Sequence, residues 1–168
     1  MKKPAVWVLS VLVIGIGPLA CGNGQERQEA EQAPAEGGGE EALRAARADS
    51  VAMAEAIYEP STFDSISWAD TDTRFERGEF VFSYSCVACH GPSGRGDGET
   101  AVEHGLDMPD FTVMDWEYAG DIPAIRRRIY IGHESEMPTW GLYGLPYRDI
   151  DAVAFYIDQV FSSRPSAE

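Results

Sequence analysis

Residues 86–90 read Cys86-Val87-Ala88-Cys89-His90, and this C-x-x-C-H stretch decides how the rest of the chain is interpreted. Cysteines three positions apart lie on nearly the same side of one helical turn, so both thiols can reach one planar group. The histidine that follows can turn its imidazole toward the same group. Three kinds of site use cysteines spaced in this way: a thiol–disulfide redox pair, a zinc knuckle and a covalent haem attachment site.

Two of these three sites fit the rest of the sequence poorly. A redox C-x-x-C pair usually belongs to a βαβ pattern, which the chain lacks. Zinc requires four ligands, typically from a second Cys or His pair, and the one further cysteine, Cys21, lies far upstream. We therefore interpret Cys86 and Cys89 as thioether attachment points for one haem c, with His90 as an axial iron ligand.

The iron of an electron carrier needs a sixth ligand as well. Met137 is favoured by its context, because Pro138 lacks an N–H and stiffens the loop that would hold the thioether sulfur. It follows His90 by 47 residues, which is enough chain to reach the opposite face of a haem. The other candidates are His104, Met108, Met114 and His133, whereas Met53 lies far upstream in the expected helix at 42–58.

Apolar spacing and capping signals predict an all-α domain of three to five helices around the haem, and no strand. The expected helices span 42–58, 73–85, 122–131 and 149–161, with Thr71 or Thr73 capping the second. Pro60 ends the first helix, Pro123 suits the first turn of the third, and Gly132 ends it. Residues 60–71 and 91–121 are expected to be loops, the second with room for one helical turn.

Four motifs in the same order resemble those of class I cytochromes c, over roughly residues 73–162. They are the Cys86–His90 attachment sequence, the Met137-Pro138 pair, Gly78 with Phe82 in the first helix of that family's domain, and Val153 with Tyr156 in its last. The sequence H-G-x-x-G-x-G-D-G at 90–98, followed by Pro109-Asp110-Phe111, is most similar to a bacterial type within the family.

This resemblance implies specific roles for several residues. Met137 would be the distal iron ligand, with His133 as the main alternative, and the first and last helices would cross at Gly78. The Pro109 carbonyl would accept a hydrogen bond from the His90 imidazole, which would fix the ring. Phe111 and Trp140 would form walls of the haem pocket.

The resemblance also implies one-electron transfer without catalysis, since His and Met together leave no open position on the iron. The expected donor is a quinol-oxidising complex and the expected acceptor is a terminal oxidase or reductase, unless the chain is a fixed subunit of such a complex. A catalytic or gas-binding haem with an open sixth site is the alternative activity, and a purely structural electron wire is a third interpretation.

The N-terminus has the layout of an export signal. Met1-Lys2-Lys3 is basic, residues 5–20 are apolar, and Cys21 follows Leu19-Ala20 as in the lipobox of bacterial lipoproteins. We expect a signal peptide at 1–20, a lipidated, disordered acidic linker at 21–41, a helical lead-in and loop at 42–72, and the cytochrome c domain at 73–168. The protein would then be periplasmic or on the outer face of the cell membrane, held there by a lipid anchor.

The acidic charge excludes general nucleic-acid binding and limits the kinds of partner. The chain has 28 Asp and Glu against 13 Lys and Arg, a formal net charge of −15, whereas phosphate contact needs a basic surface. Both lysines lie in the predicted signal peptide, so the partner surface is expected to be basic or mostly apolar. We expect the one basic cluster, Arg126-Arg127-Arg128, to be a solvated helix face rather than a set of ion pairs.

Overall fold

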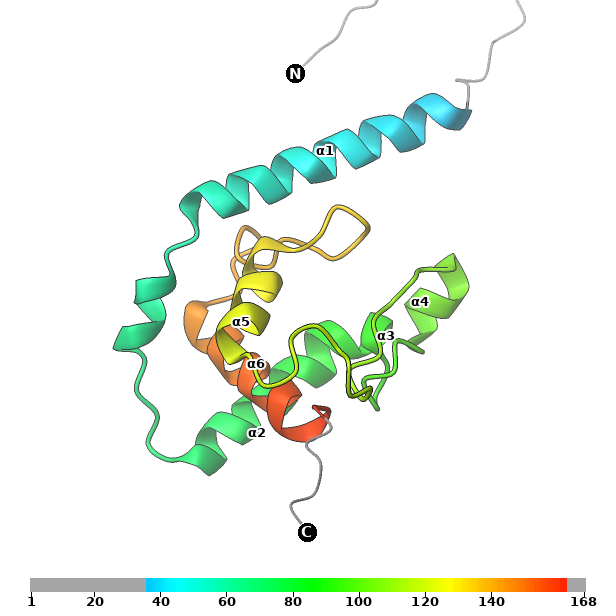
Figure 1. The fold of residues 1–168 in the computed structure, drawn as a ribbon. Coiled ribbons are helices and arrows are strands. Elements are labelled where there is room, and N and C mark those ends of the chain that lie inside the picture. Colours follow the sequence, from blue (N-terminus) through cyan, green and yellow to red (C-terminus); the bar gives the residue numbers. More distant parts are fainter. Residues whose placement is uncertain (1–35, 163–168) are drawn as a thin grey trace, which may run out of the picture. The chain divides into compact units, whose positions relative to one another are not determined.

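The computed structural model describes residues 36–162, and within them the chain is helical and forms no strand. The predicted signal peptide, Cys21 and most of the predicted linker lie outside the described residues. In chain order the elements are α1 (Glu36–Ile57), η1 (Pro60–Ser65), α2 (Thr71–Val81), η2 (Phe82–Cys86), α3 (Val87–His90), α4 (Glu99–His104), α5 (Ile122–Ile131) and α6 (Tyr147–Val160) (Figure 1). The all-α, cytochrome c-like fold expected from the sequence is confirmed.

The predicted helix at 122–131 is confirmed at both ends. Asp121 caps α5 by accepting a hydrogen bond from the Ala124 N–H, Pro123 occupies its first turn, and Gly132 ends it. The last helix is also present, although α6 begins at Tyr147, two residues earlier than predicted. Pro146 precedes this start in an extended conformation, which suits the residue before a helix.

Other helix boundaries were predicted wrongly. Helix α1 starts at Glu36, inside the expected linker, and ends at Ile57. Helix α2 starts at Thr71 rather than Thr73, because Asp70 is its cap and accepts a 2.7 Å hydrogen bond from the Thr73 N–H. The expected loop at 60–71 contains the short helix η1, whereas α4 is consistent with the helical turn expected within 91–121.

Residues 71–90 form one helical run with a π segment in its middle. Helix α2 passes into η2, in which the Val87 N–H donates to the Phe82 carbonyl five residues back, and then into α3. A π turn shifts the register of the side chains that follow it and occurs frequently at functional sites. Here the π segment ends at Cys86, the first cysteine of the attachment sequence.

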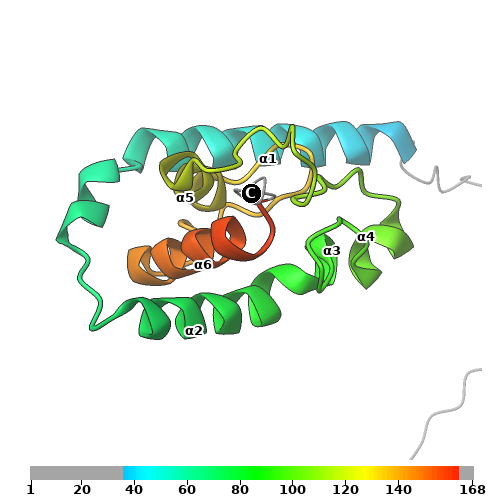
Figure 2. The same ribbon diagram turned by 60° about the horizontal axis from the view of Figure 1, so that its bottom comes forward.

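Helix α6 packs on α2 on one side and on α5 on the other, and α5 in turn contacts α1 (Figure 2). The α2–α6 contact is close at Gly78, where a side chain would collide with the Ala152 carbonyl and the Tyr156 Cβ. The crossing predicted at Gly78 is thus confirmed. Val153, beside this crossing, is fully buried.

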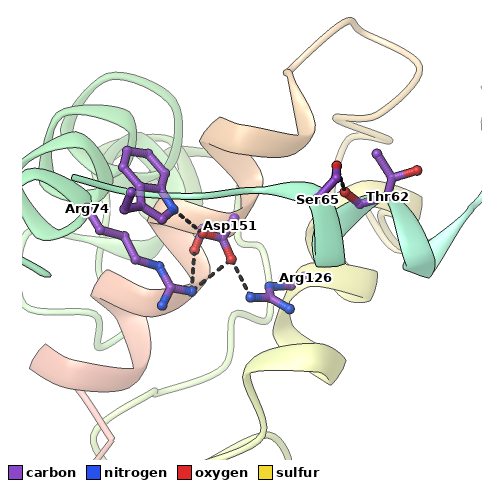
Figure 3. A network of polar contacts seen from close by, with 6 residues as sticks. Thr62, Ser65, Arg74, Arg126 and Asp151 are labelled. Atoms are coloured by element: carbon purple, nitrogen blue, oxygen red, sulfur yellow. Dashed lines mark hydrogen bonds and ion pairs between the residues drawn. The ribbon is translucent and has the colours of Figure 1, made fainter. Parts of the chain in front are cut away.

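A buried carboxylate ties four segments of the chain together (Figure 3). Asp151 of α6 is 2% exposed and accepts hydrogen bonds from Arg74 of α2, Arg126 of α5 and the Trp68 indole N–H. In the same region Phe63 is buried beneath the Arg126 guanidinium. Asp151 therefore fixes the segment before α2 onto the domain.

The prediction that Arg126-Arg127-Arg128 is a solvated face is wrong. Arg126 pairs with Asp151, and Arg127 donates to Glu55 of α1 at 2.6 Å. Arg128 donates to the Tyr118 hydroxyl at 2.6 Å. Asp151 and Glu55, the acidic partners, lie 25 and 72 residues away in sequence. Some of the many acidic residues of this chain therefore form ion pairs within the fold.

None of the helices in the described part of the chain is both long and apolar enough to cross a membrane.

Candidate functional site

The two cysteines of the attachment sequence lie where the π segment meets α3. Cys86 is the last residue of η2, Cys89 lies in α3, and both are free thiols that are partly buried. Burial raises the pKa of Cys86 to about 12, with a further increase from nearby Cys89. The Cys86 thiol is therefore protonated at neutral pH, which favours an inert, buried thiol over a reactive redox cysteine.

His90 is held by an aromatic ring. Its side chain is 9% exposed and stacks on Phe111, with ring centroids 4.6 Å apart and planes 27° apart. Burial lowers the pKa of His90 to about 4, so the imidazole is neutral at physiological pH. A neutral imidazole has the free lone pair that an iron ligand requires.

The hydrogen bond expected between His90 and Pro109 is absent. The Nδ1 atom of His90 is buried and finds no hydrogen-bond partner among the described residues, and Pro109 is exposed. The segment around Pro109 is held by the glycine loop instead. Gly96 lies against Met108, and the Phe111 N–H donates to the Gly94 carbonyl at 2.8 Å.

The glycine loop at 91–98 caps the attachment helix. The Gly96 N–H donates to the His90 carbonyl at 2.9 Å, and the Gly98 N–H donates to the Cys89 carbonyl at 3.2 Å. A side chain at position 98 would collide with the backbone of Ala88 and Cys89. The loop therefore satisfies the last carbonyls of α3, as a C-terminal cap must.

Met137 lies in a short, closed loop after α5 and packs against the hydrophobic core. The His133 N–H donates to the Met137 carbonyl at 3.0 Å, which closes the loop. Gly132, with φ +70°, packs on the Met137-Pro138 peptide so closely that any side chain would collide with it. The loop is therefore closed by its own backbone and tightly packed at Gly132, and the role of Met137 as an iron ligand stays a prediction.

The other candidate ligands lie in less suitable places. Met53 and Met114 are 61% and 79% exposed, and Met108 is partly buried with its Cβ and backbone against Gly96. His104 is exposed in the last turn of α4. His133 is exposed as well, and its Nδ1 accepts a 3.2 Å hydrogen bond from the Ser135 N–H.

Trp140 and Tyr130 flank the methionine loop. Trp140 is half-buried, and its backbone N–H donates to the Pro138 carbonyl at 3.0 Å. Tyr130, a residue that the sequence reasoning missed, is buried in α5, and its carbonyl accepts a 3.0 Å bond from Gly141. Burial and a hydrogen bond with Tyr147 raise the pKa of Tyr130 to about 12. The sequence feature that could have identified Tyr130 is its position in the expected helix at 122–131, seven residues before Met137.

The described residues fit a covalently attached haem better than a zinc ion. His90 offers a buried ring nitrogen without a protein partner, directly beside two free thiols three residues apart. Within residues 36–162 no group of three or more His, Cys, Asp and Glu side chains is placed to hold a metal ion. A zinc knuckle would require such a group.

The helical fold and the C-x-x-C-H site together define a cytochrome c domain. Residues 73–157, just over half of the chain, match the family described as "Cytochrome C oxidase, cbb3-type, subunit III", and the chain belongs to this family. The expectation from the sequence that the chain is a haem-containing cytochrome c of respiratory electron transfer is thereby confirmed.

Curated relatives share this domain with the chain. The cbb3-type cytochrome c oxidase subunit CcoP of Rhodobacter capsulatus is 31% identical over 119 residues, which cover 62% of this chain and 38% of the relative. Subunit FixP of Bradyrhizobium diazoefficiens is 36% identical over 64 residues, 38% of this chain and 20% of the relative. The alignments thus cover less than two fifths of either relative. No solved structure gives a significant match.

Proposed function

We propose that this chain is a one-electron transfer protein with a single haem c, attached through Cys86 and Cys89 and ligated by His90 and Met137. The observation that carries the proposal is the buried His90, stacked on Phe111 beside two free thiols. The sequence contains one C-x-x-C-H motif, so one attachment site is available. A bound haem would supply reversible cycling between Fe(II) and Fe(III).

The protein residues would fix the geometry on both sides of the haem. The cysteines would hold its edge to the η2–α3 junction, and Phe111 would limit rotation of the His90 ring. The closed loop after Gly132 would limit movement of the Met137 sulfur. A site with two protein ligands needs little rearrangement when the iron changes charge, which favours electron transfer over catalysis.

We propose a terminal oxidase or reductase as the electron acceptor and a quinol-oxidising complex as the donor. The relatives are named as subunits of cbb3-type cytochrome c oxidases, which supports a fixed place in such an assembly. The net charge of −15 favours a partner surface that is basic or mostly apolar. Purification from detergent distinguishes a carrier, which elutes alone, from a subunit, which copurifies in a constant ratio.

We further propose that residues 1–20 direct export and that Cys21 becomes the lipidated first residue of the mature chain. The following acidic stretch would then act as a linker between the anchor and α1, outside the cytoplasm. Replacing Cys21 with serine should release the protein from the membrane fraction, whereas the unmodified sequence should remain with it. Retention of the Cys21→Ser protein would argue against the lipid anchor.

Haem content and redox behaviour test the electron-transfer function. The mass of the purified chain should include one haem, and this haem should stay with the peptide that contains Cys86 and Cys89 after acid extraction. An optical redox titration should follow a one-electron curve. Rapid binding of carbon monoxide to the reduced protein would instead indicate an open sixth site and contradict the proposal.

A further inference from the structure

Helix α1 lies outside the residues that match the family, yet one of its faces is buried against the domain. Arg47 and Val51 are partly buried, and Ala54 is fully buried within the hydrophobic core. These positions are spaced by four and three residues, so they form one face of the helix. Directly after the helix, the Tyr58 ring lies 5.2 Å from that of Tyr130.

Two ion pairs fasten this face at different points along the helix. Arg127 of α5 donates to Glu55 at 2.6 Å, and Arg47 pairs with Glu136 at 2.6 Å. Residues 47 and 55 are about 12 Å apart along a helix axis. Helix α1 therefore reaches from α5 to the loop that follows it, and both lie beside it in Figure 1.

The partner of Arg47 is the residue directly before the predicted iron ligand. Glu136 has φ +146°, the one positive φ at a non-glycine residue among the described residues. Such a conformation persists only where the surroundings hold it. The Glu136 N–H donates to the His133 carbonyl at 3.4 Å, a long hydrogen bond. The ion pair with Arg47 gives this strained position a second attachment, from outside the loop.

We propose that α1 is a clamp on the methionine loop, in which Arg47 is a positioning residue that holds Glu136 and, through it, Met137. This inference rests on the proposed function in one respect, namely that Met137 binds the iron. Without the clamp, the loop opens more often and the methionine leaves the iron more often. An external ligand then competes for the vacated position with higher apparent affinity.

Imidazole binding to the oxidised, full-length haem protein tests the clamp. Arg47→Ala should raise the apparent affinity for imidazole about two- to fivefold, the range expected for loss of a partly exposed ion pair. Arg44→Ala is the matched control, because Arg44 is exposed on the same helix and has no ion pair among the described residues. Its affinity for imidazole should equal that of the unmodified protein.

Charge exchange separates positioning from a general loss of stability. Glu136→Arg alone should behave like Arg47→Ala, and combining it with Arg47→Glu should restore the affinity for imidazole to near the original value. If Arg47→Ala and Glu136→Arg both change the affinity for imidazole and the double variant does not restore it, a direct role for the Arg47–Glu136 ion pair is contradicted.

Hydrogen–deuterium exchange gives a second readout that does not depend on the identity of the iron ligand. Amides of residues 133–137 should exchange faster in Arg47→Ala than in Arg44→Ala, while those of α6 should be unchanged. Equal exchange and equal imidazole affinity in the two variants would overturn the clamp. A Met137→Ala spectrum identical to that of the unmodified protein would overturn the ligand assignment alone, and faster loop exchange would then still support the clamp.

Discussion

The His90 imidazole stacks on the Phe111 ring, with centroids 4.6 Å apart. The glycine loop and α4 both lie between these two residues in the sequence. Phe111 is 6% exposed and also contacts Trp116 and Phe161. The ring that stacks on His90 is therefore part of the main core. The orientation of His90 and the stability of the domain should change together.

Phe111→Ala should lower the free energy of unfolding by about 3–5 kcal/mol, because it removes a buried aromatic ring and leaves a cavity beside His90. Guanidinium unfolding of the haem protein measures this loss. Val102→Ala, at a position 71% exposed, is the control and should change stability by less than about 0.5 kcal/mol. A Phe111→Ala protein as stable as the control would show that the ring is not part of the core.

Gly78→Ala should destabilise the protein by about 1–3 kcal/mol, because the added methyl group would meet the α6 backbone, which cannot move aside easily. Gly39→Ala is the matched control, since a methyl group there meets nothing within 4 Å. Alanine is favoured over glycine in a helix, so this variant should be neutral or stabilised by up to about 1 kcal/mol. Thermal unfolding compares the two, and equal melting temperatures would contradict the close crossing.

Asp151→Asn should cost about 3 kcal/mol, because it leaves the partly buried Arg74 and Arg126 without a counter-charge. Arg127→Ala breaks the exposed pair with Glu55 and should cost less than about 1 kcal/mol. Urea unfolding of both proteins gives the comparison. Similar losses for the two variants would mean that the Asp151 network contributes no more than a surface pair.

Local signals predicted the parts of the fold that depend on nearby residues. The third helix was predicted at its observed bounds because Pro123 and Gly132 mark its ends within the sequence itself. The crossing at Gly78 followed from the resemblance to a known family. The cap at Asp70 was missed because adjacent threonines are also good caps, and only the fold decides among them.

Long-range pairing explains most of what the sequence did not predict. Arg126 and Arg127 form a charged run that resembles a solvated face, and their partners come from α6 and α1. Pro109 was expected to accept a hydrogen bond from His90, but the His90 Nδ1 has no hydrogen-bond partner among the described residues, and the glycine loop holds the backbone of the nearby Phe111. The site residues stay predictions of the sequence, although the structure places His90 and Met137 in suitable surroundings.

The Asp70 cap should make stability depend on pH at the acidic end. The Thr73 N–H lowers the pKa of Asp70, so the folded state holds its carboxylate ionised to lower pH than the unfolded state does. Its contribution is complete above the unfolded pKa, near pH 4, and is lost as pH falls through the folded pKa. Asp70→Asn keeps an acceptor that does not titrate, and therefore should lose less stability than the unmodified protein on acidification. Urea unfolding at several pH values measures the free energy of unfolding of both proteins. Equal decreases in the two proteins on acidification would contradict a contribution from the Asp70 carboxylate.

The spectrum of Met137→Ala beside the unmodified protein tests the central claim most directly. The unmodified oxidised protein should show the low-spin signature of methionine-ligated haem, including its weak long-wavelength absorption band. That band should disappear in Met137→Ala and the reduction potential should fall, while the haem remains attached through Cys86 and Cys89. An unchanged six-coordinate spectrum with an unchanged potential would show that Met137 is not the ligand and would contradict the proposed site.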